Sequence, residues 1–219
     1  MSNKKRILIM VTEGQTDEEF YKKVTIHTKN KCNCKRYCFD EIKHMCAYGI
    51  GKMDSKILAK FNFEICQSEK YKNSEKVVCL CYDLDVFKVN KKNPPIDREK
   101  LKKQLYNYGA DKVIEIIADD MIEDFFLFDI EGIKKYLNLK KKYKLPKKRE
   151  GLELLKKMFK DGNKIYSKGD KAAGLIDSLD FDLILSHICD QVSKLCDELG
   201  YNCKKNTCKI DEEPQKNKK

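Results

Sequence analysis

The chain has 219 residues, 41% of them hydrophobic and 37% charged, with a formal net charge of +11 at pH 7. No stretch approaches the roughly 18 apolar residues of a membrane helix, which argues against a membrane protein. The basic start is followed by an apolar run too short for a signal peptide, so we expect a cytoplasmic protein. The charge indicates an anionic partner, with nucleic acid the first choice. The alternative is a merely lysine-rich composition, because arginine, the bidentate phosphate binder, is scarce.

The first predicted element is a strand over residues 6–12, because a short continuous apolar run is typical of a strand buried on both faces. Glu13 and Gly14 follow as a turn. Thr16 is predicted to be the N-cap of a helix, with Glu19 completing a capping box. The spacing of the next residues predicts that this helix buries Phe20, Val24 and His27.

Strands and helices then alternate. Strands are expected at about 35–42, 76–85 and 111–119, and helices at about 54–65, 97–109 and 121–137. This alternation predicts an α/β fold of the Rossmann-like kind, with a mostly parallel sheet flanked by helices.

Beyond residue 140 the strand signals stop, and helices are predicted at about 150–160 and 182–199. The predicted organisation is an α/β domain at 1–139, a basic helical extension at 140–203 and a polar tail at 204–219. The sequence around the first boundary carries basic residues with no acid between them: Lys134, Lys135, Lys140, Lys141, Lys142, Lys144, Lys147, Lys148 and Arg149. Such a run is either a solvated face or a nucleic-acid clamp.

Eleven cysteines raise the question of disulfides or zinc. The chain is neither small nor evidently secreted, so free thiols are expected. Cys79 and Cys81 alternate in an apolar run and are predicted to be core residues. A structural zinc site is the weaker alternative, because no C-x2-C pair occurs among the candidates Cys32, Cys34, Cys38, His44, Cys46, Cys203 and Cys208.

Acidic residues follow three of the predicted strands. Ligands of open α/β sheets bind at the carboxyl ends of the strands, and carboxylates crowded at one edge repel each other unless a cation intervenes. Oxygen ligands suit Mg²⁺ or Mn²⁺, so the sequence predicts a site for one or two such ions. Asp83 and Asp85, two apart, are expected to share one face of an extended strand. The acids at this edge are Glu13, Asp17, Asp83, Asp85, Asp119, Asp120, Glu123 and Asp124.

The segments "VTEGQTDEEFY" and "CLCYDLDVF" resemble the topoisomerase–primase (Toprim) domain. Its signature is a Glu-Gly after the first strand and an Asp-x-Asp after a later strand, which here match Glu13, Gly14, Asp83 and Asp85. The first motif, of the form E-G-x-T-D-x-x-F-Y, is most similar to that of the small nucleases of the overcoming-lysogenization-defect (OLD) class and of the RloB-like and PARIS-effector-like proteins of phage defence. The resemblance covers about residues 6–137, and the cysteine-rich stretch between the motifs has no counterpart in it.

The resemblance implies a Toprim-like catalytic domain at 1–139 and a Mg²⁺- or Mn²⁺-dependent nuclease acting on DNA or tRNA in antiphage defence. The metal ligands would be Glu13, Asp17, Asp83, Asp85 and Glu123. Glu13 is a ligand or a general base, and Asp119 and Asp120 are alternatively a helix N-cap pair. No ATP-binding P-loop occurs, so an ATPase would be a separate partner or unnecessary, and a homodimer is left open.

Lys168, in "YSKGDKAAG", is expected either to stabilise charge on the phosphate or to be an ordinary surface lysine. Two other functions compete with the nuclease. One is a Toprim-like regulatory subunit that binds nucleic acid or a nucleotide without cutting it. The other is a zinc-organised interaction protein.

Overall fold

The computed structural model describes residues 4–32, 38–89, 94–119, 121–146, 151–202, 204–205 and 207–208. Within these ranges four strands form one sheet in which every neighbouring pair is parallel, in the order β2-β1-β3-β4. The strands are β1 (Arg6–Thr12), β2 (Glu41–Cys46), β3 (Glu75–Asp83) and β4 (Lys112–Ala118). The predicted α/β, Rossmann-like class with a C-terminal helical region is confirmed, and the sheet is wholly rather than mostly parallel.

The two central strands are buried on both faces, which explains their continuous apolar runs. Side chains of a strand alternate between faces, so Leu8 and Met10 of β1 enter one hydrophobic cluster, while Ile7 and Ile9 enter the cluster on the other side. In β3, Cys79 and Cys81 are completely buried in the first cluster, as predicted for core residues.

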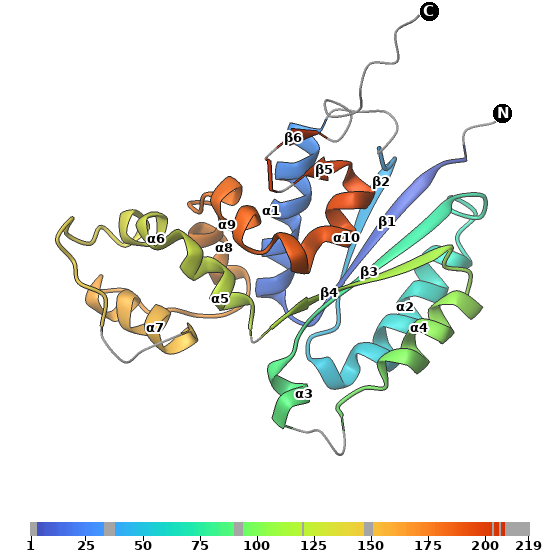
Figure 1. The fold of residues 1–219 in the computed structure, drawn as a ribbon. Helices are drawn as coiled ribbons and strands as arrows, with labels where there is room; N and C mark the ends of the chain where they lie inside the picture. The colour runs from blue at the N-terminus through green and yellow to red at the C-terminus, as the bar shows by residue number, and fades with distance from the viewer. Residues whose placement is uncertain are drawn as a thin grey trace, which may run out of the picture.

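One face of the sheet is covered by α1 and the C-terminal helices, and the other by α2, α4 and the turns around α2 (Figure 1). On this second face lie a 3-10 helix (Ile50–Lys52), π-helical turns (Met53–Ile57 and Phe61–Cys66) on either side of α2 (Leu58–Lys60), and α4 (Arg98–Asn107). The short α3 (Asp85–Val89) follows β3 directly. Helix α1 (Gln15–Lys31) starts at the edge of the sheet where β1 ends.

The C-terminal region is a succession of short helices. They are α5 (Ile122–Phe126), a 3-10 turn (Leu127–Asp129), α6 (Ile130–Tyr136), α7 (Gly151–Asp161), a 3-10 turn (Asp170–Ala172), α8 (Ala173–Ile176), α9 (Phe181–His187) and α10 (Cys189–Leu199). Their apolar side chains belong to the same hydrophobic cluster as those of β1, α1, β3 and β4. The sheet and the helical extension therefore share one core across the predicted boundary at 139/140.

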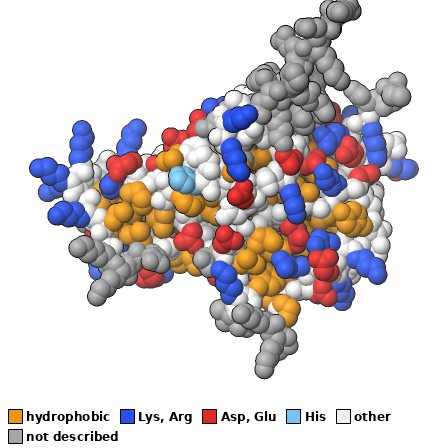
Figure 2. All heavy atoms as spheres, in the orientation of Figure 1, with side chains coloured by type: hydrophobic (Ala, Val, Ile, Leu, Met, Phe, Trp, Pro, Cys, Tyr) orange, Lys and Arg blue, Asp and Glu red, His pale blue; other side chains and the backbone are white. Residues whose placement is uncertain are grey.

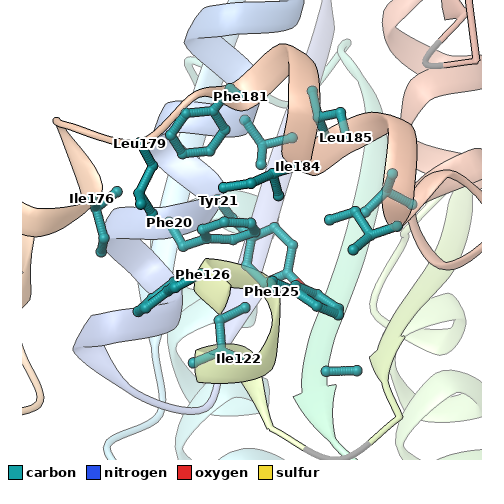
Figure 3. Packing of buried hydrophobic residues seen from close by; sticks show 14 of the residues in the cluster. Phe20, Tyr21, Ile122, Phe125, Phe126, Ile176, Leu179, Phe181, Ile184 and Leu185 are labelled. Carbon is teal, nitrogen blue, oxygen red and sulfur yellow. The ribbon is translucent and has the colours of Figure 1, made fainter. Parts of the chain in front are cut away.

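Aromatic rings form the centre of that shared core (Figure 3). The ring of Phe20, on α1, lies 5.9 Å from that of Phe125, 5.7 Å from that of Phe126 and 5.4 Å from that of Phe181, measured between centroids. Such tilted contacts add to the burial of apolar area. The ring of Phe20 thus holds α1 against two phenylalanines of α5 and one of α9.

Ion pairs connect the last long helix to the start of the sheet. Glu198 of α10 accepts from Arg6 at 3.0 Å and pairs with Lys112 of β4. Arg6 also pairs with Glu75 at 2.8 Å. Because the side chain of Glu198 is only 10% exposed, water screens these pairs less than ordinary surface pairs.

Some local predictions are wrong. The N-cap of α1 is Gly14 instead of Thr16, and the Asp17 carboxylate instead of Glu19 accepts from the cap N–H, at 3.1 Å. The Thr16 hydroxyl accepts from the N–H of Gly169 at 2.7 Å, and Glu19 pairs with Lys22 on the helix surface. Tertiary partners therefore override the local capping pattern.

Three element boundaries also differ from the prediction. Strand β2 begins only at Glu41, and residues 35–37 of the expected strand lie outside the described residues. The helix expected at 182–199 is two helices that meet at Ile188. The tail is not wholly irregular, because β5 (Tyr201–Asn202) pairs antiparallel with β6 (Thr207–Cys208).

The expectation of free thiols is wrong for Cys32, which is disulfide-bonded. In the described ranges, Cys46, Cys66, Cys79 and Cys81 are free thiols. Two zinc candidates, Cys34 and Cys203, lie outside the described residues. Among the helices of the described ranges, none has the length and apolar character that crossing a bilayer requires.

Candidate active site at the carboxyl ends of the strands

The parallel pairing of β1 and β3 brings the two acidic motifs to one edge of the sheet. Thr12 pairs with Cys81, so Glu13 and Asp83 follow within two residues of this pair. The backbone N–H of Asp83 is close enough to the Glu13 carboxylate to lower its pKa, as is that of Ile50. The end of β3, the first turn of α1 and the start of α5 meet at this edge (Figure 1).

Asp83 is a buried carboxyl group, and few hydrogen bonds compensate its removal from water. Its Oδ2 accepts weakly from the N–H of Ile122 at 3.4 Å, and its Oδ1 has no hydrogen-bond partner. Burial, followed by the negative charges of Asp17 and Glu13, raises the pKa of Asp83 to about 8. Without a cation the side chain therefore holds a proton near neutral pH.

Asp17 is buried in the first turn of α1. Burial is the largest cause that raises its pKa to about 7, and the carboxylates of Glu13 and Glu123 add to it, against the N–H groups of Asp17 and Gly14 that lower it. Because its Oδ2 accepts from Gly14, this carboxylate already has a structural task.

Glu13 lies between a negative and a positive neighbour. Burial and then the charge of Asp85 raise its pKa, while Lys168 and the N–H groups of Ile50 and Asp83 lower it, with a net rise. Its Oε2 is buried and has no hydrogen-bond partner, and neither has the nearby hydroxyl of Thr12. A buried polar atom without a partner costs free energy, so these atoms favour binding of a ligand.

Glu123 has no exposed surface, and two side chains from one loop satisfy it. Its Oε1 accepts from the hydroxyl of Tyr166 at 3.0 Å, and the Nζ of Lys168 lies 3.0 Å from Oε1 and 3.2 Å from Oε2. Burial lowers the pKa of Lys168, but the charges of Glu123, Asp83 and Asp17 outweigh it and leave that pKa raised. The lysine is therefore a cation that faces the acidic cluster.

The expected geometry of the Asp-x-Asp motif is wrong. Strand β3 ends at Asp83, Leu84 forms a bend, and Asp85 is the first residue of α3. The two carboxylates therefore do not share a face of an extended strand. Asp85 still lies close enough to Glu13 and Asp83 to raise the pKa of both.

Of the acids that follow β4, Glu123 belongs to the acidic cluster, whereas Asp119 has a different partner. Asp119 accepts from the side-chain amide of Gln191 at 3.3 Å, and Asp120 lies outside the described residues. The N-cap of α5 is Met121, whose N–H is bonded by Asp124 at 3.2 Å. The prediction that Asp119 is an N-cap is therefore wrong.

Some residues of the site could not be recognised from the sequence. Tyr166 follows a polar stretch without periodicity, and only the buried Glu123 reveals its role. The bond from Gly169 to Thr16 fixes the loop that carries Lys168 against the start of α1. At Gly169 the backbone has φ +91°, which favours glycine. This glycine next to Lys168 was the one local hint.

The donor set fits a hard divalent cation in its chemistry, with carboxylate oxygens that are buried, crowded and partly unpartnered. Within the part of the chain that the structure describes, however, no group of three or more His, Cys, Asp or Glu side chains is placed to hold a metal ion. Mg²⁺ usually takes one or two carboxylates and keeps several waters, and Glu13 and Asp83 offer one unpartnered buried oxygen each.

A comparison with protein-family models, with curated proteins and with solved structures finds no match to this chain.

Proposed function

We propose that the protein is a Toprim-type, Mg²⁺- or Mn²⁺-dependent nuclease that hydrolyses phosphodiester bonds. The observation that carries the proposal is the meeting of the half-buried Glu13 and the buried Asp83, which follow neighbouring strand ends and each have one buried carboxylate oxygen without a partner, beside the cationic Lys168. A structural role gives no reason to bury mutually repelling acids, whereas a phosphate and a cation would compensate them.

Each residue has a role in this proposal. Glu13 and Asp83, with Asp85 next to them, would hold the ion, while Asp17 supports the turn. The ion, when bound, would neutralise the carboxylates and the charge on the phosphate. Glu13, with its raised pKa, is alternatively placed to accept a proton from the attacking water.

Lys168 would donate to a non-bridging phosphate oxygen, where negative charge increases in the transition state. Glu123 and Tyr166 hold this lysine in place and keep it charged. The proposal thus assigns the loop after α7 a part in the reaction.

The basic surface supports a nucleic-acid substrate. Lys140, Lys142 and Lys164 line a hollow of about 460 Å³ between the ends of α6 and α7, away from the acidic cluster. Figure 2 shows basic side chains gathered at the end of the molecule that α6 and the following segment form. Phosphate contacts from lysines give little base specificity and a marked salt dependence. Lys147, Lys148 and Arg149 of the basic run lie outside the described residues.

The biological setting rests on the resemblance alone. It suggests a cytoplasmic protein of antiphage defence that cuts host tRNA or DNA, with any ATPase as a separate partner. Whether two copies associate is part of the same proposal and is measured by the mass of the protein in solution.

The test is cleavage of plasmid DNA and bulk tRNA with Mg²⁺, Mn²⁺ or EDTA. Wild type should cut at least one substrate only with metal, and Glu13→Gln and Asp83→Asn should lower the rate by more than about 100-fold. Asp119→Asn is the matched control, because this acid follows the last residue of β4 at the same edge but accepts a hydrogen bond from Gln191. Equal cutting by Asp83→Asn and Asp119→Asn contradicts the proposed site.

A non-catalytic nucleic-acid-binding or nucleotide-binding subunit is the second candidate function. It is favoured by the absence of a three-ligand metal group among the described residues. Binding of nucleic acid by wild type without metal-dependent cutting of any substrate would support this candidate over the nuclease.

A further inference from the structure

The loop after β2 presents an exposed aromatic ring at the same edge of the sheet. Tyr48 is 53% exposed, although large aromatic side chains usually contribute to cores. The loop is tied to the proposed site, because Ala47 donates to the carbonyl of Thr12 and Gly49 to that of Glu13, both at 2.9 Å. The ring of Tyr48 is thus carried by a backbone bonded to the residue that starts the acidic cluster.

The backbone at Tyr48 is in the left-handed region, with φ 60°. This conformation is uncommon outside glycine, asparagine and aspartate, and a bulky residue adopts it under strain. Glycine or asparagine would form the same turn more easily. The burial of the ring does not compensate the strain, so a tyrosine here has a use that the folded chain by itself does not show.

One cation contacts this ring, and two more lysines lie close to that cation in the sequence. The Nζ of Lys56 lies 4.1 Å from the ring centroid, a cation–π contact that fixes one face of the tyrosine. Lys52 lies four positions before Lys56 and Lys60 four positions after it. For none of the three does an acidic partner occur among the residues in the described ranges.

The backbone beside the ring is open. A Cβ built at Gly49 or at Gly51 would meet no atom within 4 Å. At Gly51, where φ is not in the left-handed region, neither sterics nor conformation demands glycine. Open glycine backbone lets a ligand approach closely, and the cations define that ligand as an anion with an aromatic part.

We propose that Tyr48 stacks on an unpaired nucleobase next to the bond that is cut, while Lys52 and Lys56 contact the neighbouring phosphates. This deepens the proposed function, on which it rests, and assigns the substrate class: single-stranded or looped nucleic acid rather than regular duplex. In a duplex each base is already stacked, so an aromatic side chain gains nothing from it unless the base is extruded.

The experiment uses the lack of tryptophan in this chain. Tyr48→Trp introduces a single reporter, and its fluorescence is followed in EDTA during titration with oligo-dT, oligo-U, a duplex of equal length and an abasic strand of equal charge. We expect quenching that saturates with oligo-dT or oligo-U and is absent with the duplex and the abasic strand. The stronger of the two single strands identifies DNA or RNA as the natural partner.

Binding of the variants supplies the second measurement. Tyr48→Asn, which suits the left-handed backbone, should lower the affinity for the single strand about tenfold and leave duplex affinity unchanged, and Tyr48→Phe should retain wild-type affinity. Equal quenching by the abasic strand, or unchanged affinity of Tyr48→Asn, overturns the inference.

The two proposals can fail separately, because the binding is measured without metal and without cleavage. Base-dependent quenching with no metal-dependent cutting refutes the nuclease but leaves the stacking site. Metal-dependent cutting that persists in Tyr48→Asn with equal preference for single strand and duplex refutes the stacking site but leaves the nuclease.

Discussion

Lys168 and Glu123 form an ion pair across 45 positions of the chain, with Nζ 3.0 Å from the nearer oxygen of a carboxylate that has no exposed surface. The lysine is 53% exposed on its side chain, so only one partner is fully removed from water. The pair joins the loop after α7 to the first turn of α5, and with it the helical extension to the edge of the sheet.

Lys168→Met is expected to destabilise the protein, because it leaves the Glu123 carboxylate buried with only the Tyr166 hydroxyl as partner. Since the lysine is half exposed, the loss should lie below that of a fully buried pair, at about 1–2 kcal/mol. Urea unfolding measures it. The double variant Lys168→Met/Glu123→Gln should recover most of the loss, and an equal loss in both variants would show that the pair does not carry the effect.

The stability of the metal-free protein should fall as the pH rises from about 4 to about 8. The ordinary Asp pKa of 3.8 is raised in the folded chain to about 8 at Asp83 and about 7 at Asp17. Below pH 3.8 both carboxyl groups are protonated in the folded and in the unfolded chain, so their burial does not lower the free energy of unfolding. Through the window up to pH 8 the unfolded chain ionises first, which lowers the free energy of unfolding. Thermal melts in EDTA across this range measure the slope.

Asp83→Asn should flatten that slope and raise the stability at pH 8 by about 2 kcal/mol, or about 4–8 °C in Tm. The amide retains an oxygen for the N–H of Ile122 but carries no charge. Mg²⁺ should stabilise wild type at pH 8 and leave Asp83→Asn unchanged. A variant that melts below wild type in EDTA at pH 8 contradicts the repulsion described for this cluster.

Asp129→Ala should cost about 2–3 kcal/mol. This buried carboxylate accepts from the N–H groups of Gly132 and Asp180, both at 2.8 Å, and so links the starts of α6 and α9. Asp97→Ala is the matched control: it removes an exposed cap that makes a single bond to Lys100, and should cost about 1 kcal/mol. Equal costs in denaturant unfolding would refute the linking role of Asp129.

If the nuclease proposal holds, Lys168→Arg should retain more activity than Lys168→Met, which should lower kcat about 100-fold with a small change in KM. Both variants are assayed at a temperature where circular dichroism shows them folded. A change confined to KM would instead assign Lys168 to substrate binding in the ground state.

The sheet could be predicted because a strand that is buried on both faces needs a nearly continuous apolar sequence. The runs at β1 and β3 are continuous and apolar, and the run at β4 is interrupted only by Glu115. Each of the three is followed by acids, so their shared edge follows from parallel pairing. Strand β2 lacks such a run, because its side chains from Glu41 to His44 are only half-buried at the border of the sheet. Its predicted start was accordingly too early.

The failures in the site have a different cause. Thr16 and Glu19 satisfy the local rule for a capping box, but Thr16 bonds a residue 153 positions away, and such a partner leaves no trace in the neighbouring sequence. Tyr166 was missed for the same reason. At Leu84 the N–H still donates to Ala118 of the adjacent strand, while its carbonyl already accepts from Phe87 and Lys88, so α3 starts directly after β3 instead of the strand continuing to Asp85.

The aromatic contact between Phe20 and Phe181 has a consequence for the order of synthesis. A ribosome adds about 5–20 residues per second, so the face of the sheet on which α9 and α10 lie stays open for on the order of ten seconds after α1 has emerged. During that interval β2, β3 and β4 are synthesised while the apolar side chains on this face of the sheet are still uncovered, and Lys168 is made only towards its end. Uncovered apolar surface of this kind makes a nascent chain prone to aggregation, and the acidic edge is completed only after the loop that carries Lys168 has been synthesised.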